Sequence, residues 1–120
     1  MPEVQFNLRY VVLRHEGIPD PHFDLMLETA PGSKLATWRA PVWPIDGPVE
    51  IVLIGDHRRE YLDYEGPLSE NRGHVRRVDA GTCRVGSEGP VGQTFQLESA
   101  RGETVRLELA SYGRWIVSPS

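Results

Sequence analysis

Cysteine, long apolar runs and excess positive charge are all scarce in this chain of 120 residues. Its single cysteine, Cys83, excludes an internal disulfide, which agrees with a reducing compartment. No apolar run approaches the roughly 20 residues that a membrane-spanning helix needs, so we expect no membrane partner. The first ten residues, MPEVQFNLRY, lack the basic and apolar regions of a secretory signal. We therefore expect a cytoplasmic protein.

The charge balance limits the kind of nucleic-acid contact that the chain can make. A net charge of −4 argues against extensive, sequence-independent binding to nucleic acid, because such binding relies on many cations at phosphates. Arginine nevertheless clusters locally, at residues 58–59 and again between residues 72 and 84. These arginines are either solubilising surface charges or a local contact with one phosphate or one strand end.

The chain has the composition of an ordinary globular domain, with 39% hydrophobic and 25% charged residues, and we expect one domain over residues 1–120. Short β-rich segments separated by glycine and proline predict an all-β fold. We expect a small closed or nearly closed β-barrel of about eight strands, because closure removes exposed sheet edges. One short helix is expected over residues 56–64, capped by Asp56. The expected strands are residues 6–15, 22–29, 34–40, 49–55, 74–79, 82–86, 92–99, 103–110 and 113–118.

The segment RHEGIPDPHFDLMLE carries the strongest functional signal. Successive side chains of a strand point to opposite faces, so His22, Asp24, Met26 and Glu28 share one face. His15 ends the preceding strand, and the loop between the two strands folds the chain back toward it. Two imidazoles and a carboxylate that converge from neighbouring strands form a site for a divalent metal such as Mn²⁺ or Zn²⁺. The alternative is a histidine and an aspartate on a solvated strand face.

A second constellation lies in DHRREYLDYEG. His57 and Tyr61 are four residues apart, so on a short helix they share a face. An imidazole can exchange a proton near neutral pH, and a phenol can donate a hydrogen bond to a charged oxygen. Alone, the pair also fits an ordinary surface helix. Together with the metal ligands, it is typical of a metal-assisted hydrolase of phosphate esters.

Four landmarks in order resemble a known family, the 3′-phosphoesterase domain of bacterial end-joining DNA ligase D. RHEG followed by HFDLMLE resembles the family's K-H-D and H-Y-D-F-R-L-E, and TWRAP resembles its S-W-A-V-P. DHRREYLDYEG resembles D-H-P-x-x-Y-x-x-F-E-G, and ENRGHVRRVDAGT resembles the glycine-rich stretch and strand that follow. The resemblance extends from about Tyr10 to Trp115.

This resemblance implies a small β-barrel that binds Mn²⁺, with Zn²⁺ or Co²⁺ as alternatives, and that trims 3′ ends of DNA or of primers ending in ribonucleotides. It assigns His15, His22 and Asp24 to the metal, and His57 and Tyr61 to the phosphate. Such a protein would act in end-joining repair beside a ligase or polymerase recruited in trans. Further candidates for substrate contact are Arg14, Glu28, Arg72 and Arg76.

Two departures from the family pattern leave the activity open. The family's phosphate-binding arginine is Met26 here, and a lysine after its W-A-V-P stretch is replaced by Val42. A cation elsewhere, such as Arg14, Arg39 or an arginine of residues 72–77, would have to substitute. One alternative function is therefore a catalytically weak module that binds a metal or phosphate and recognises a strand end or a repair partner. Another is a cupin-like metal oxygenase, although the chain lacks the close His-x-His pair of those sites.

Overall fold

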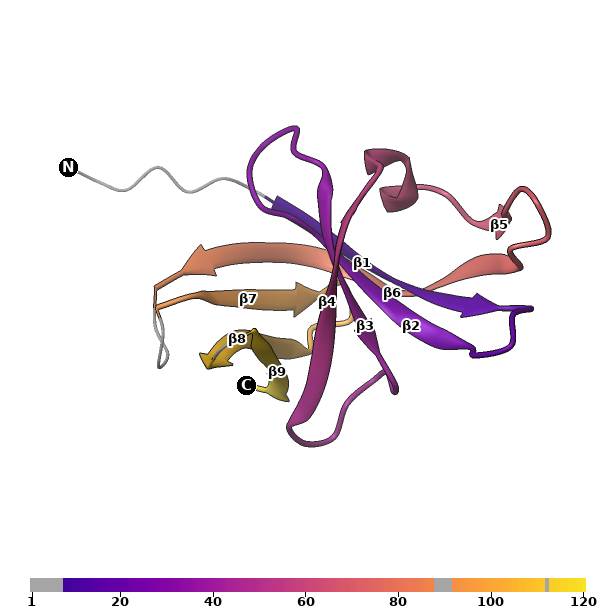
Figure 1. Ribbon diagram of the computed structural model, residues 1–120. Coiled ribbons are helices and arrows are strands. Elements are labelled where there is room, and N and C mark those ends of the chain that lie inside the picture. The colour runs from indigo at the N-terminus through magenta and orange to yellow at the C-terminus, as the bar shows by residue number, and fades with distance from the viewer. Residues whose placement is uncertain (1–7, 88–91, 112) are drawn as a thin grey trace.

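The computed structural model describes residues 8–87, 92–111 and 113–120, and β-strands dominate this part of the chain (Figure 1). The strands are antiparallel and short, as expected for β-rich segments divided by glycine and proline. The elements in chain order are β1 (Leu8–Glu16), β2 (His22–Glu28), β3 (Leu35–Ala40), β4 (Val49–His57), the 3₁₀ helix η1 (Arg59–Leu62), β5 (Gly66–Pro67), β6 (His74–Gly86), β7 (Thr94–Ser99), β8 (Thr104–Ser111) and β9 (Arg114–Pro119).

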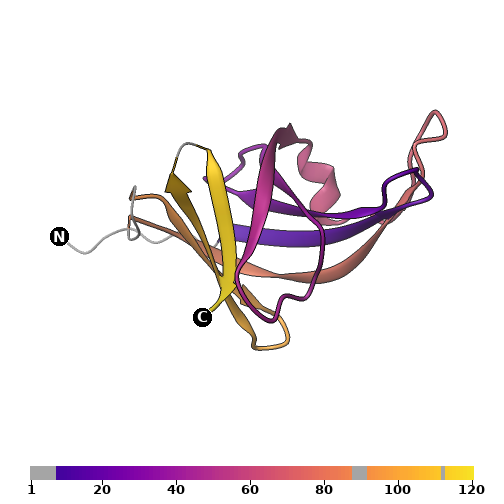
Figure 2. The ribbon, with the colours of Figure 1, turned by 60° about the horizontal axis from the view of Figure 1, so that its bottom comes forward.

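Eight of these strands close into an antiparallel barrel, which confirms the all-β barrel predicted from the sequence. The strands follow the order β1-β2-β3-β4-β9-β8-β7-β6, and β6 pairs with β1 to complete the circle. The two residues of β5 pair with the start of β6 outside this circle. Figure 2 shows β1, β2 and β6 extending together beyond the barrel, with η1 above them. No helix among the described residues is long and apolar enough to cross a membrane.

The sheet is buried on both faces where β1 and β2 run together. An inner apolar cluster draws residues from all eight barrel strands and fills the barrel, with Trp38 only 1% exposed. A smaller apolar cluster lies on the outer face, where Leu62 of η1 covers the sheet. We call it the outer cluster; its buried members are Val11, Leu13, Met26, Leu35, Leu62 and Val75.

A buried carboxylate ties the loop after β3 into the barrel. Asp79 accepts hydrogen bonds from Tyr10 Oη at 3.2 Å, Trp43 Nε1 at 3.0 Å and Ser99 Oγ at 2.7 Å. Burial and the neighbouring Asp79 charge raise the pKa of the Tyr10 phenol, which therefore stays a donor. Trp43, in the loop after β3, also packs into the inner cluster.

Three predicted elements need correction. The strands expected at residues 74–79 and 82–86 are one continuous strand, β6, which bends at a register shift opposite Val12 and Leu13. The helix expected over residues 56–64 is only the four-residue η1, because β4 keeps pairing with β3 as far as His57. Asp56 therefore lies in β4 and caps nothing. The two residues of β5 were not foreseen.

Cys83 is expected to resist thiol reagents in the folded protein. Its thiol is 1% exposed, and burial together with the nearby Glu28 charge raises its pKa to about 12. The reactive form is the thiolate, and an unfolded cysteine has a pKa near 8.5, so labelling at pH 8 should be about a thousandfold slower in native buffer than in urea. Kinetics with a chromogenic disulfide reagent measure this ratio. Equal rates in both solvents would mean that the barrel opens around β6.

Candidate metal centre

The end of the β1–β2 hairpin brings together the three residues that the sequence singled out. His15 lies directly opposite His22 in the antiparallel pair, and Asp24 lies one step along the same face, opposite Leu13. The hairpin loop leaves β1 through Gly17 at φ 75°, a conformation that L side chains rarely adopt. The alternation expected from sequence therefore holds, and it points all three side chains to the outer face.

The three side chains are close enough to share one ion. The shortest approaches are 3.3 Å from His22 Nε2 to Asp24 Oδ1 and 3.8 Å from His15 Nδ1 to Asp24 Oδ2. One potential ligand atom from each residue lies within 4.8 Å of the others. His22 and Asp24 are each 5% exposed, so a solvated strand face, the alternative left open by the sequence, does not describe this site.

Backbone carbonyls fix which nitrogen of each imidazole faces the aspartate. His15 Nε2 lies 2.7 Å from the carbonyl oxygen of Arg72, and His22 Nδ1 lies 2.8 Å from that of Asp20. A carbonyl oxygen can only accept, so these two nitrogens carry the ring hydrogens. In the neutral form of each ring, the opposite nitrogens, His15 Nδ1 and His22 Nε2, carry lone pairs directed toward Asp24.

The arrangement leaves buried acceptors without donors. His22 Nε2 and Asp24 Oδ1 are buried and have no hydrogen-bond partner. Lone pairs that face one another in a buried site are unfavourable unless a proton or a metal cation lies between them. Metal-binding histidines typically donate their second N–H to a carbonyl in this way. His15, His22 and Asp24 can therefore hold a divalent metal ion, and three protein ligands leave coordination positions free for a substrate.

His57 and Tyr61 lie on the same outer face but form a separate group. Their rings are 6.1 Å apart, edge to face, although His57 ends β4 and Tyr61 belongs to η1. The register places His57 beside Leu35 and Leu35 beside Glu28, which is four residues from Asp24 along β2. In a flat sheet this separates the backbones of His57 and Asp24 by roughly 16 Å. The structure therefore brings His57 and Tyr61 together, and neither belongs to the group of His15, His22 and Asp24 that could hold an ion.

The arginine candidates for substrate contact differ in how freely they can move. The Arg14 guanidinium stacks over the Phe23 ring at 4.6 Å. Arg76 reaches Glu16 at 3.3 Å and is otherwise exposed. Arg72 bonds its own turn, donating from Nε to the Ser69 carbonyl oxygen at 3.0 Å and from its terminal nitrogen to Ser69 Oγ at 2.9 Å.

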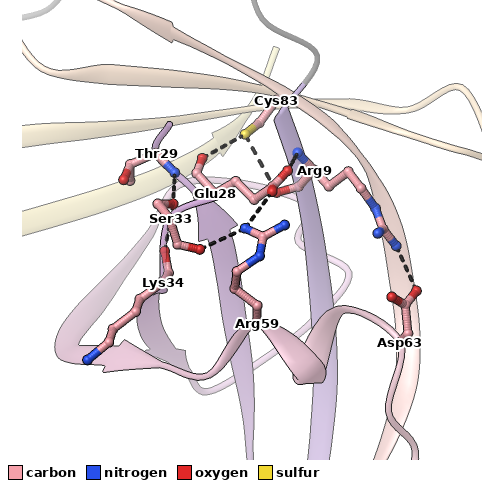
Figure 3. Close-up of polar contacts among 8 residues, drawn as sticks. All are labelled: Arg9, Glu28, Thr29, Ser33, Lys34, Arg59, Asp63 and Cys83. Atoms are coloured by element: carbon pink, nitrogen blue, oxygen red, sulfur yellow. Dashed lines mark hydrogen bonds and ion pairs between the residues drawn. The ribbon is translucent and has the colours of Figure 1, made fainter. Parts of the chain in front are cut away.

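The Glu28 carboxylate is occupied by contacts within the protein (Figure 3). Its carboxylate pairs with Arg59 at 2.7 Å and accepts the backbone N–H of Arg9 at 2.7 Å. Arg59 also donates to the carbonyl oxygen of Ser33, so it links η1 to β2 and to the turn before β3. This ion pair joins residues far apart in the sequence, and no local pattern indicated it.

The two positions where the family has cations behave differently. Met26 shares the face of His22 and Asp24, as alternation predicts, but it is 2% exposed and packs into the outer cluster. Val42 is 44% exposed in the loop after β3. Arg39 lies directly across the β2–β3 pair from Asp24 and is exposed. Within the described residues, no hydrogen bond or ion pair holds its guanidinium.

No protein-family model matches this chain, and no curated protein matches it either. The residues and their geometry therefore carry the functional argument.

Proposed function

We propose that this protein is a metal-dependent phosphoesterase that acts on nucleic-acid 3′ ends, similar to the 3′-phosphoesterase domain of ligase D, with Mn²⁺ as its ion. One observation carries the proposal: possible ligand atoms of His15, His22 and Asp24 lie within 4.8 Å of one another, and backbone carbonyls orient both imidazoles. Two of these residues also have a buried atom without a hydrogen-bond partner, His22 Nε2 and Asp24 Oδ1. The family resemblance of the sequence supports the choice of reaction and substrate.

The residues at the site have separate roles in this proposal. A bound divalent ion would supply Lewis-acid polarisation of a phosphoryl oxygen. Arg39, opposite Asp24, is placed to offer a guanidinium fork to the same phosphate in place of the missing cation at Met26. His57 and Tyr61, which contact each other outside the group of His15, His22 and Asp24, would contact the substrate phosphate, as the family resemblance implies.

A second candidate function is a module that binds a metal-held phosphate and recognises a strand end, with weak or no catalysis. The observation in its favour is the apolar burial of Met26, which leaves the immediate neighbour of Asp24 on its strand face without charge. Losing a cation that stabilises charge in the transition state lowers the rate more than the affinity.

The assay that separates these functions uses the full chain and a DNA primer ending in a 3′ phosphate. A phosphoesterase should release inorganic phosphate in Mn²⁺ and stop in excess chelator. Arg39→Gln should lower the rate roughly a hundredfold if the guanidinium stabilises transition-state charge. Arg106→Gln is the matched control, because Arg106 lies on β8, which β4 and β9 separate from the strand of Arg39. Arg106→Gln should therefore release phosphate at the wild-type rate.

The outcomes are distinct. Mn²⁺-dependent binding of the primer without phosphate release supports the binding module. A protein that takes up no divalent ion and neither binds nor cleaves the primer contradicts both functions.

A further inference from the structure

A pocket of about 480 Å³ lies beside the candidate metal centre, between η1 and the turn that follows β5. Its volume is in the range of small-molecule sites. It combines aromatic rings with two arginines and one carboxylate, and its lining includes Arg58, Glu60, Tyr61, Tyr64, Ser69 and Arg72. Glu60 pairs with Arg58 at 3.6 Å, which leaves the charge of Arg72 for a ligand. In Figure 1 the elements that frame it, η1 and β5, lie on the same side of the long strands β1 and β6.

Arg72 joins the wall of this pocket to the metal centre. Its carbonyl oxygen receives the ring N–H of His15, while Arg72 also lines the pocket and its guanidinium is held by Ser69, another lining residue. One residue therefore contacts a metal ligand through its backbone and presents a fixed positive charge to the pocket. A ligand that fills the pocket and carries a phosphate at one end would have that phosphate beside Arg72.

The aromatic wall suits a planar ring. Tyr61 and Tyr64 contact each other edge to face, with 6.2 Å between ring centroids. The Tyr64 hydroxyl donates to the carbonyl oxygen of Pro67, which fixes the ring without using its face. Exposed tyrosine rings stack nucleobases with little regard to base identity, since every base has a π-face.

We propose that this pocket binds the terminal nucleoside of the strand, with its base against Tyr64 and its 3′ phosphate beside Arg72. The inference rests on the proposed function of the metal centre and adds to it a separate pocket that recognises the base of the terminal nucleotide. The base supplies affinity through stacking, and the fixed cation places the phosphate on the side of His15.

Calorimetric titration with 3′-AMP and with inorganic phosphate tests the inference on the full chain, first with chelator present so that no metal contributes. The wild-type protein should bind 3′-AMP at least tenfold more tightly than phosphate. Tyr64→Leu should weaken 3′-AMP roughly ten- to a hundredfold and leave phosphate unchanged, as expected for one stacked base. Tyr64→Phe keeps the ring and is the matched control, so it should retain most of the affinity.

A third variant tests the phosphate end. Arg72→Gln should weaken 3′-AMP and inorganic phosphate by the same factor. Thermal melts accompany each titration, so that a loss of binding is read only from folded protein. Equal wild-type affinities for 3′-AMP and phosphate, or wild-type binding by folded Tyr64→Leu, would overturn the inference. Mn²⁺-dependent phosphate release without base-dependent binding would overturn this inference and keep the proposed function. Base-dependent binding of 3′-AMP without Mn²⁺-dependent phosphate release would support the pocket and contradict the proposed phosphoesterase.

Discussion

Replacing Met26 by arginine should destabilise the protein by about 3–5 kcal/mol, the range for an uncompensated buried charge. Met26 is 2% exposed and packs among Leu13, Leu35 and Leu62. A guanidinium at this position would have to remain among apolar side chains or push η1 off the sheet. Both carboxylates that flank Met26 on its strand face are already engaged, since Asp24 lies against the two histidines and Glu28 pairs with Arg59. The family's cation therefore does not fit this chain without further changes.

Urea unfolding of the wild type, Met26→Arg and Met26→Leu measures the effect. Leucine keeps the volume and the apolar character of the side chain, so Met26→Leu should differ from the wild type by less than about 1.5 kcal/mol. A wild-type unfolding midpoint for Met26→Arg would show that the outer cluster opens easily around residue 26. Met26 would then be a poor marker of the binding-module function.

The outer cluster shows which part of the fold the sequence could predict. Alternation alone places Met26 on the face of His22 and Asp24, and the register confirms this. Alternation does not say what covers that face. The run Tyr10-Val11-Val12-Leu13 contains a signal for it, because four consecutive apolar residues imply a strand buried on both faces. The cover is Leu62, whose contact with β1 and β2 depends on tertiary packing and has no local signature.

The candidate site was predictable for a similar reason. His15, His22 and Asp24 come from one hairpin, so strand periodicity and a short loop are enough to bring them together. Of the two carbonyls that orient the imidazoles, only one could be predicted from the local sequence. Asp20 is two residues from His22, but Arg72 is 57 residues from His15, and only the completed barrel brings them into contact. The position of His57 was missed because strand pairing with β3 overrode the helical propensity of its segment.

If Asp24 is a metal ligand, Asp24→Asn should raise the free energy of unfolding without metal and abolish the stabilisation by Mn²⁺. The carboxamide keeps the shape of the carboxylate but can donate a hydrogen bond to His22 Nε2, now 3.3 Å from a partnerless oxygen. Without metal, the variant should therefore be more stable than the wild type by about 1–3 kcal/mol, the free energy of a buried group left unsatisfied. With Mn²⁺ at a hundred times its dissociation constant, the wild type should gain about 2.7 kcal/mol and the variant almost nothing.

Thermal melts in chelator and in excess Mn²⁺, with metal content measured on the same samples, test both parts of this expectation. Glu16→Gln is the matched control, because it removes the same charge from the same hairpin but from a carboxylate that pairs with Arg76. This control should keep the full Mn²⁺ shift and gain no stability in chelator. An Asp24→Asn protein that Mn²⁺ stabilises as much as it does the wild type would remove Asp24 from the ligand set. The lone pairs of His15 and His22 would then need another explanation.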